Sequence, residues 1–202
     1  MSGPQPEDGP PVGRRERKKA RTRADIQREA FRLFREKGYD HTTMEEIAEA
    51  ADVSASTLFR HFASKEALVL TDEYDPVIIE ACRSQPAELG AVEAVRRGIR
   101  DVFERVNAEA LAEVRERANL AVSIPDLRAA MLDQMAQAIR DITAVVAERA
   151  GLTSDDFAVA TVSGAIMGVI FSAELYWLEH PESELFNLLD DALARLEDGL
   201  QL

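Results

Sequence analysis

The chain has 202 residues, enough for one large domain or two small ones, and its 46% hydrophobic and 30% charged residues are typical of a globular protein with a buried core. Its one cysteine, Cys82, excludes a disulfide framework and a thiolate zinc site, and its three scattered histidines lack the spacing of metal ligands. The net charge of −13 at pH 7, taken alone, argues against a nucleic-acid partner.

The chain carries no evident targeting signal. No unbroken apolar run approaches the roughly 20 residues of a membrane span, and Met1–Pro6 lacks the charged and apolar blocks of a signal peptide. We therefore expect a cytoplasmic protein without membrane contact, metal or cofactor. Residues 1–13 contain four prolines and three glycines without apolar periodicity, and are expected to form a disordered tail.

The charge is distributed unevenly along the chain. Residues 1–70 hold 13 basic and 12 acidic residues, whereas residues 71–202 hold 11 basic and 25 acidic ones. Seven of the ten residues in Arg14–Arg23 are basic. Such asymmetry is a hint of a nucleic-acid-binding end. The acidic part should repel DNA and leave the amino-terminal part to dock.

Three helices are predicted within residues 14–66. The first follows the basic stretch, with an apolar face at Ile26, Ala30, Leu33 and Phe34, and ends at Gly38. Thr43 to Glu46 matches a capping box that opens a short second helix, and Ser54 can cap a third from Ala55 to about Phe62. Two short helices joined by such a turn form a helix-turn-helix unit, and Ser64 can cap a fourth helix.

The rest of the chain, residues 67–202, reads as helical throughout. Apolar periodicity predicts helices over about 89–106, over 127–146 with Gly151 as the end, from Thr153 to about Glu179 before Pro181, and from about Ser183 to Leu200. Pro76 should kink or break the helix that follows Ser64. The expected fold is therefore all-α, with an amino-terminal helix-turn-helix domain and a helical bundle for ligand binding and dimerisation.

A helix-turn-helix lays its second helix in the major groove of DNA. The exposed residues of that helix should be Ala55, Ser56, Thr57, Phe59, Arg60 and His61. Thr57 can contact a base edge or a thymine methyl, and Arg60 can read guanine or bind a phosphate. His61 and Lys65 should contact phosphates, with Lys65 and the following helix start forming an anion site. The basic stretch, with Arg21 and Arg23, can act as an arm along the backbone or in the minor groove.

Each of these features also has a purely structural interpretation. The capped turn could be an ordinary corner between two helices, His61 could be a core histidine between Phe59 and Phe62, and the basic run could be a solubility tail. Their occurrence together, in this order and spacing, favours DNA binding.

The stretches Thr43–Ala48, Val53-Ser54, Thr57–Phe62 and Ser64–Leu68 resemble the DNA-binding domain of TetR-family transcriptional regulators, over about residues 20–70. The resemblance implies a homodimer, a palindromic operator and repression relieved by a small molecule. It assigns Thr43, Ser54, His61 and Lys65 mainly to the DNA backbone, and Ala55, Ser56, Thr57 and Arg60 to the groove.

Three residues depart from the family pattern. Asp52 stands where glycine is common in the turn, and Asp tolerates the left-handed conformation. Ser56 replaces another frequent glycine, which would add a contact to a base or phosphate. Phe59 stands where a tyrosine often supplies a phosphate-binding hydroxyl, so that contact is in doubt.

The helical bundle could enclose a ligand pocket. The candidate lining residues are Phe103, Asn107, Met131, Met135, Met167, Phe171, Glu174 and Trp177, with Asn119 as a further polar anchor. Because such a stripe is also typical of plain core, both interpretations stay open. The negative charge favours a neutral or cationic ligand, whereas Arg96, Arg97 and Arg100 could receive an anionic group.

Gly164, Gly168 and Ser172 form a smooth ridge that permits close helix approach, either within the chain or between two copies. We expect homodimerisation through the last two helices. The chain is thus predicted to be a sequence-specific DNA-binding regulator, a dimeric repressor released from a palindromic operator by an unknown small molecule, with activation left open as the alternative mode. The alternative is a helical small-molecule-binding or protein-interaction module without DNA readout. No catalytic triad, phosphate loop or dinucleotide fingerprint suggests an enzyme.

Overall fold

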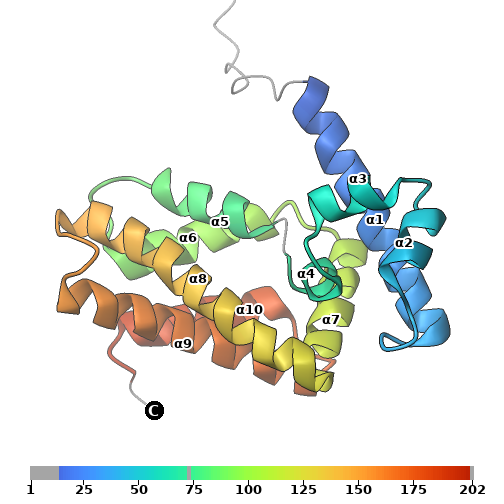
Figure 1. Cartoon of the computed structure of the whole chain (residues 1–202). Coiled ribbons are helices and arrows are strands. Elements are labelled where there is room, and N and C mark those ends of the chain that lie inside the picture. The colour runs from blue at the N-terminus through green and yellow to red at the C-terminus, as the bar shows by residue number, and fades with distance from the viewer. Residues whose placement is uncertain (1–13, 72–73, 201–202) are drawn as a thin grey trace, which may run out of the picture. The chain divides into compact units, whose positions relative to one another are not determined.

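The computed structural model describes residues 14–71 and 74–200, and the expected tail of residues 1–13 lies outside them. The chain divides into two compact units, one up to Val69 and the other from Leu70 onward. The described residues form ten α-helices and no strand, which confirms the all-α fold class (Figure 1).

The first unit consists of α1 (Arg14–Lys37), α2 (Met44–Ala50), α3 (Ala55–His61) and α4 (Lys65–Leu70). Their apolar faces meet in a small core that includes Ile26, Phe34, Ile47, Leu58, Phe62 and Leu68. The buried Gln27 amide also donates to the Leu68 carbonyl over 3.0 Å, which ties α4 to α1. Because α1 begins at Arg14, the prediction that the basic stretch precedes the first helix is wrong. The residues of the basic stretch form the first turns of α1, which runs without a break from Arg14 to Lys37.

The helix boundaries of this unit follow from short polar motifs. The Glu46 amide donates to Thr43 Oγ1 (3.2 Å) and the Thr43 amide donates to the Glu46 carboxylate (3.0 Å), which confirms the predicted capping box. Gly38 ends α1 with a φ of 86°, and Asp52 turns the chain between α2 and α3 with a φ of 52°. Both values lie in the left-handed region, as the sequence predicted.

Six helices lie in the part of the second unit that the structure describes. They are α5 (Tyr74–Arg83), α6 (Ala91–Phe103), α7 (Ala108–Ser123), α8 (Pro125–Ala150), α9 (Phe157–Glu179) and α10 (Leu185–Glu197). The helix after Ser64 is interrupted as predicted, since α4 ends at Leu70 and Pro76 lies in the first turn of α5. A proline is tolerated there because the amide it lacks would have no partner within the helix. The helix α7 was not identified from the sequence.

The core of the second unit joins α5, α6, α8, α9 and α10 around residues such as Val95, Val145, Ile166 and Leu193. Charged side chains tie the elements together at its edges. Arg149 of α8 donates to the carbonyls of Cys82, Gln85, Pro86 and Leu89 and so fixes the α5–α6 connection. Arg115 of α7 donates to the carbonyls of Trp177 and Pro181 at the end of α9.

The helix α9 is long and apolar. It has 23 residues and a mean hydropathy of 1.7 in its most apolar window, so by length and composition it could cross a membrane. The sequence shows no unbroken apolar run of that length because Ser, Thr and Gly interrupt it, but these residues barely lower the hydropathy. Only 22% of that window is buried within the chain, so much of this apolar helix lacks a cover from its own protomer.

Candidate functional site

The exposed face of α3 is made of small and polar side chains. Ala55, Ser56, Phe59 and Arg60 are exposed, while Leu58 is fully buried and anchors the helix to the core. Thr57 is half-buried. Ala55, Ser56, Thr57 and Arg60 are the positions predicted to face the DNA groove. Three of them are exposed and Thr57 is partly exposed.

The start of α3 is held by hydroxyl groups. Ser54 Oγ accepts from the Thr57 amide over 3.1 Å, which caps the helix, and donates to Thr57 Oγ1 over 2.9 Å. Ser56 Oγ lies 3.1 Å from Ser54 Oγ. The three hydroxyls thus form one cluster at the amino-terminal end of α3, the end that meets base edges in helix-turn-helix proteins.

Basic side chains gather at the opposite end of α3. The Arg23 guanidinium of α1 lies over the Phe62 ring, 4.6 Å from its centroid. The pKa of the neighbouring His61 is lowered, first by burial and then by the positive charges of Arg60, Arg23 and Lys19. His61 Nδ1 is buried and has no hydrogen-bond partner among the described residues. The charges come from two helices and create a positive potential beside α3.

Lys65 has an internal role that sequence reasoning did not anticipate. Its ammonium donates to the carbonyls of Tyr39 (2.8 Å) and Thr42 (3.1 Å) and lies 4.2 Å from the centroid of the Tyr39 ring. It therefore fixes the α1–α2 connection onto α4. The expected contact of Lys65 with phosphate competes with these bonds.

The remaining candidates for DNA contacts lie at the surface or near it. Arg21 is exposed on α1, and Thr43 is exposed at the start of α2 with its hydroxyl in the capping box. The Phe59 side chain is 47% exposed and has no polar group that could bind a phosphate. An aromatic ring left at the surface of α3 is available for apolar contact with a base.

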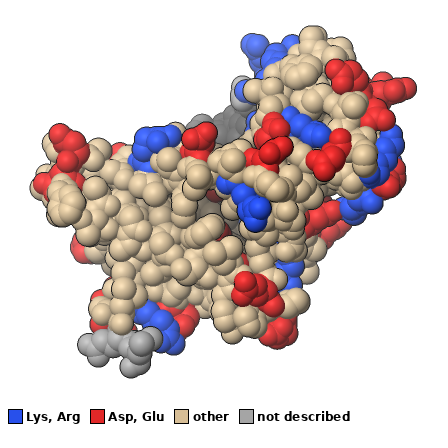
Figure 2. Space-filling view, turned by 60° about the horizontal axis from the view of Figure 1, so that its bottom comes forward, with Lys and Arg blue, Asp and Glu red and all other residues tan. Residues whose placement is uncertain are grey.

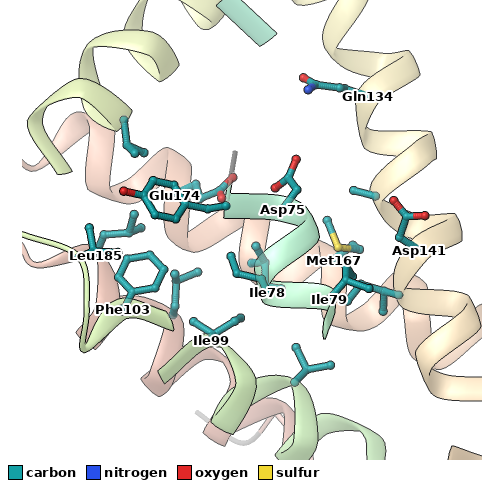
Figure 3. Close-up of a pocket in the computed structure, with 18 of the residues that line it drawn as sticks. Asp75, Ile78, Ile79, Ile99, Phe103, Gln134, Asp141, Met167, Glu174 and Leu185 are labelled. Atoms are coloured by element: carbon teal, nitrogen blue, oxygen red, sulfur yellow. The ribbon is translucent and has the colours of Figure 1, made fainter. Parts of the chain in front are cut away.

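The second unit encloses a cavity of about 240 Å³ (Figure 3). Its lining comes from α5, α6, α7, α8, α9 and α10, and is mostly apolar: Ile78, Ile79, Val95, Ile99, Phe103, Val106, Leu111, Val114, Ala138, Ile142, Met167, Ile170, Leu185 and Leu189. The polar lining residues are Tyr74, Asp75, Gln134, Gln137, Asp141 and Glu174. An apolar cavity with a few polar groups is the usual form of a small-molecule site.

Of the residues predicted to line a pocket, Phe103, Met167 and Glu174 do so. The other five, and the further polar anchor Asn119, which is exposed on α7, lie elsewhere in the same unit. The Asn107 side chain caps α7 by accepting from the Ala110 amide over 2.8 Å. Trp177 is buried in the core with the Arg115 guanidinium 4.1 Å from its ring centroid, and Met131, Met135 and Phe171 are half-buried outside the lining.

The sequence reasoning missed the contribution of α5 and the polar face of α8. Gln134, Gln137 and Asp141 share one side of α8 because they are spaced by three and four residues. That spacing is present in the sequence, whereas the prediction rested on the methionines Met131 and Met135 of the same helix. Nothing in the sequence signalled that α5 would supply Ile78 and Ile79.

The arginines of α6 are engaged with acidic side chains away from the cavity. Arg96 donates to both carboxylate oxygens of Asp190 (2.8 and 3.0 Å), and Arg100 donates to the same carboxylate over 2.7 Å. Arg97 pairs with Glu93 over 2.6 Å. The pKa of Asp190 is accordingly lowered, chiefly by its hydrogen bond from Arg96. The pairs with Asp190 join α6 to α10, whereas the Arg97–Glu93 pair lies within α6, and none of the three arginines lines the cavity.

The exposed face of α9 is apolar or small. No charged residue occurs between Phe157 and Ala173, and Phe157 is 85% exposed. Nothing described lies within 4 Å of a methyl group placed on Gly164 or Gly168, so this ridge is not packed against another helix of the same protomer. Figure 2, which turns the lower side of Figure 1 forward, shows a broad area of the second unit with few charged side chains.

Family profiles match both units. The profile of the bacterial regulatory proteins of the tetR family matches residues 26–71, and the profile of the MftR C-terminal domain, a TetR-type carboxyl-terminal domain, matches residues 89–201. The helix-turn-helix and the cavity-bearing bundle thus each correspond to one of these profiles.

Individual relatives agree with the profiles. The transcriptional regulator TcmR of Streptomyces glaucescens is 35% identical over 93% of this chain and 88% of its own length. A proposed mycofactocin biosynthesis regulator of Mycobacterium tuberculosis, MftR, is 27% identical over 94% of both chains. The crystal structure of the repressor FadR of Thermus thermophilus, in complex with lauroyl-CoA, is 26% identical, with a TM-score of 0.54 over 89% of this chain and 95% of that one. The chain therefore belongs to the TetR family of DNA-binding transcriptional regulators, which bind small-molecule effectors.

Proposed function

We propose that this chain is a homodimeric repressor that binds a palindromic operator in the cytoplasm and leaves it when a small molecule enters the cavity of the second unit. The observation that carries DNA readout is the surface of α3, where exposed small and polar side chains are flanked by the cations of Arg23, Arg60 and Lys19. Small side chains allow close approach to base edges, and the cations favour the phosphates on either side.

The readout residues divide by position on α3. Ala55, Ser56 and Thr57 occupy the helix start that meets base edges, while Arg60 lies on the exposed face near the other end. The cations of α1 and the half-buried His61 serve phosphate contacts. Thr43 and Ser54, whose hydroxyls cap α2 and α3, lie where the backbone of DNA would pass the helix ends.

Dimerisation is supported by the uncovered ridge of α9. An apolar helix face of this length is costly to leave in water, and Gly164 and Gly168 permit a second helix to approach closely. A two-fold axis through α9 and α10 would present two copies of α3 to the two halves of a palindrome.

A substitution on the ridge tests this interface. Gly168→Arg should give a monomer, because the protomer has room for the side chain while a closely packed partner has none. Ala136→Arg on the exposed face of α8 is the matched control and should remain dimeric. Light scattering after size exclusion measures both. A Gly168→Arg protein that is still dimeric would place the interface elsewhere.

Operator binding is tested on the DNA flanking the gene. Footprinting should reveal a protected palindrome, and Arg60→Ala should weaken binding to it by about 1–3 kcal/mol if Arg60 reads a base. Arg128→Ala, an exposed arginine of the second unit, is the control. An equal loss on matched and scrambled DNA would restrict Arg60 to phosphate contact. No binding of the wild-type protein at low salt would favour a ligand-binding or protein-interaction module without DNA readout.

A further inference from the structure

The side chains of α3 that do not enter the core fall into three rows along the helix. Residues four positions apart share a row, because each residue turns the helix by about 100°. Leu58 and Phe62 form the buried row, with exposed fractions of 0% and 1%. The other rows, in order around the helix, are Ala55 with Phe59, Ser56 with Arg60, and Thr57 with His61. The first of these is apolar, whereas the other two carry polar groups.

The Phe59 ring dominates the apolar row. It is 47% exposed, although Leu58 and Phe62 already anchor α3 to the core. Ala55 lies one turn before it and is exposed as well, so the two side chains form one apolar strip. Neither has a hydrogen-bond donor or acceptor, so this strip cannot recognise a phosphate or a polar base edge. A large ring is unfavourable in water, and a partner that covers it lowers the free energy.

The hydroxyl groups at the start of α3 are partly used within the protein. Ser54 Oγ accepts from the Thr57 amide over 3.1 Å and donates to Thr57 Oγ1 over 2.9 Å. Ser56 Oγ lies 3.1 Å from Ser54 Oγ. Because these groups serve the helix cap, a larger share of base recognition falls to Arg60 and to the apolar strip.

The major groove offers one apolar group to such a strip, the 5-methyl group of thymine. A helix-turn-helix lays its second helix, here α3, in that groove. We infer that the Phe59 ring, together with Ala55, contacts a thymine methyl group, so that each half of the operator carries a thymine at this position. Phe59 is then a specificity-determining residue, because adenine, guanine and cytosine lack the methyl group. This inference rests on the proposed operator binding and specifies one base of the operator.

Replacement of thymine by deoxyuridine tests the methyl group alone, because the hydrogen-bonding groups of the base pair are unchanged. The operator found by footprinting is synthesised with deoxyuridine at one thymine position at a time, in both half-sites together. Fluorescence anisotropy measures the affinity of the full-length protein. We expect one position with a loss of about fourfold per half-site, or about fifteenfold for the pair, since burial of one such carbon is worth about 0.8 kcal/mol.

Variants then assign the methyl contact to a residue. With Phe59→Ala, which leaves the core unchanged because the ring is exposed, thymine and deoxyuridine at that position should bind equally well. Leu132→Ala, which removes a 69% exposed apolar side chain from α8, is the matched control and should keep the full dependence.

Two results would overturn the inference while operator binding stands. One is an operator in which no thymine is sensitive to loss of its methyl group. The other is a methyl dependence that persists in Phe59→Ala, since another residue would then make the contact. Absence of operator binding by the wild-type protein at low salt would instead overturn the proposed function.

Discussion

At the scale of single residues, the first unit uses its cations in two different ways. Arg60 and Lys19 lie near His61 and raise the local potential, whereas the Lys65 ammonium is bonded to two backbone carbonyls and an aromatic face. The sequence alone did not separate these roles, because all three residues carry the same charge and belong to the same unit.

Lys65→Ala should lower the free energy of unfolding of the first unit by about 1.5–3 kcal/mol, because hydrogen bonds from a charged donor are among the stronger ones. Lys37→Ala is the matched control, since Lys37 forms an exposed ion pair with Glu46 and surface pairs contribute little. Chemical denaturation measures both variants. If the two substitutions lower the free energy of unfolding by the same amount, the Lys65 hydrogen bonds do not stabilise the fold.

His61 should make operator binding depend on pH. In the free protein its pKa lies below the ordinary value of about 6.5, through burial and the charges of Arg60, Arg23 and Lys19. A phosphate beside the ring would raise that pKa, so the complex takes up a proton and binds more tightly as pH falls through and below about 6.5. Fluorescence anisotropy at pH 7.5 and 5.5 measures the change.

The control for this titration is His180→Asn in the second unit, which should keep the pH dependence, while His61→Asn should remove it. A wild-type affinity that is flat or falls with acidity would mean that no phosphate lies close to His61.

At the scale of elements, the contact between α5 and α6 depends on one glycine. A methyl group at Gly98 would lie 2.6 Å from Cys82 Sγ, 2.7 Å from the Cys82 nitrogen and 2.9 Å from its Cα. Because two of these atoms belong to the backbone, the helices themselves would have to move apart. The buried Cys82, whose pKa is raised to about 12 by burial, acts here as a small apolar side chain.

Gly98→Ala should therefore destabilise the second unit by about 1–3 kcal/mol, although alanine is the better helix former. The control variant is Gly90→Ala at the start of α6, where nothing lies within 4 Å of the new methyl group. This substitution should lower the free energy of unfolding by less than about 1 kcal/mol. Thermal and urea unfolding report both. A Gly98→Ala protein as stable as the wild type would contradict the close packing.

At the scale of the whole molecule, the net charge of −13 conceals a basic segment at the start of α1. Lys18, Lys19 and Arg21 are all exposed there, within a helix rather than an extended arm. DNA affinity that arises from such charges falls steeply with salt, because bound phosphates release their counterions.

Replacement of Lys18, Lys19 and Arg21 by glutamine should lower the slope of log affinity against log salt by up to about 2.7, at roughly 0.9 per lost phosphate contact. The same replacement of Arg83, Arg128 and Arg140 in the second unit changes the net charge equally and should leave the slope unchanged. Titrations between low and physiological salt distinguish the two variants. Equal slopes would exclude the start of α1 from the DNA interface.

Much of the first unit could be predicted from the sequence because its signals are local. The capping box at Thr43, the cap at Ser54, and the left-handed residues Gly38 and Asp52 act on backbone groups within a few positions of themselves. The face of α3 follows from the same periodicity, since a buried Leu58 fixes which side of a short helix points outward. The extension of α1 to Arg14 was missed because basic residues form helices as readily as they form arms.

The sequence by itself determined the all-α class, the helix-turn-helix, the exposed face of α3 and the family. The tertiary structure alone decided which residues line the cavity, that the α6 arginines belong to ion pairs with Asp190 and Glu93, and that Gly164 and Gly168 are uncovered in the protomer. The physical reason is the range of the interactions. Caps and helix faces depend on residues within one or two turns, whereas the cavity, the ion pairs and the exposed ridge depend on which faces of distant helices meet.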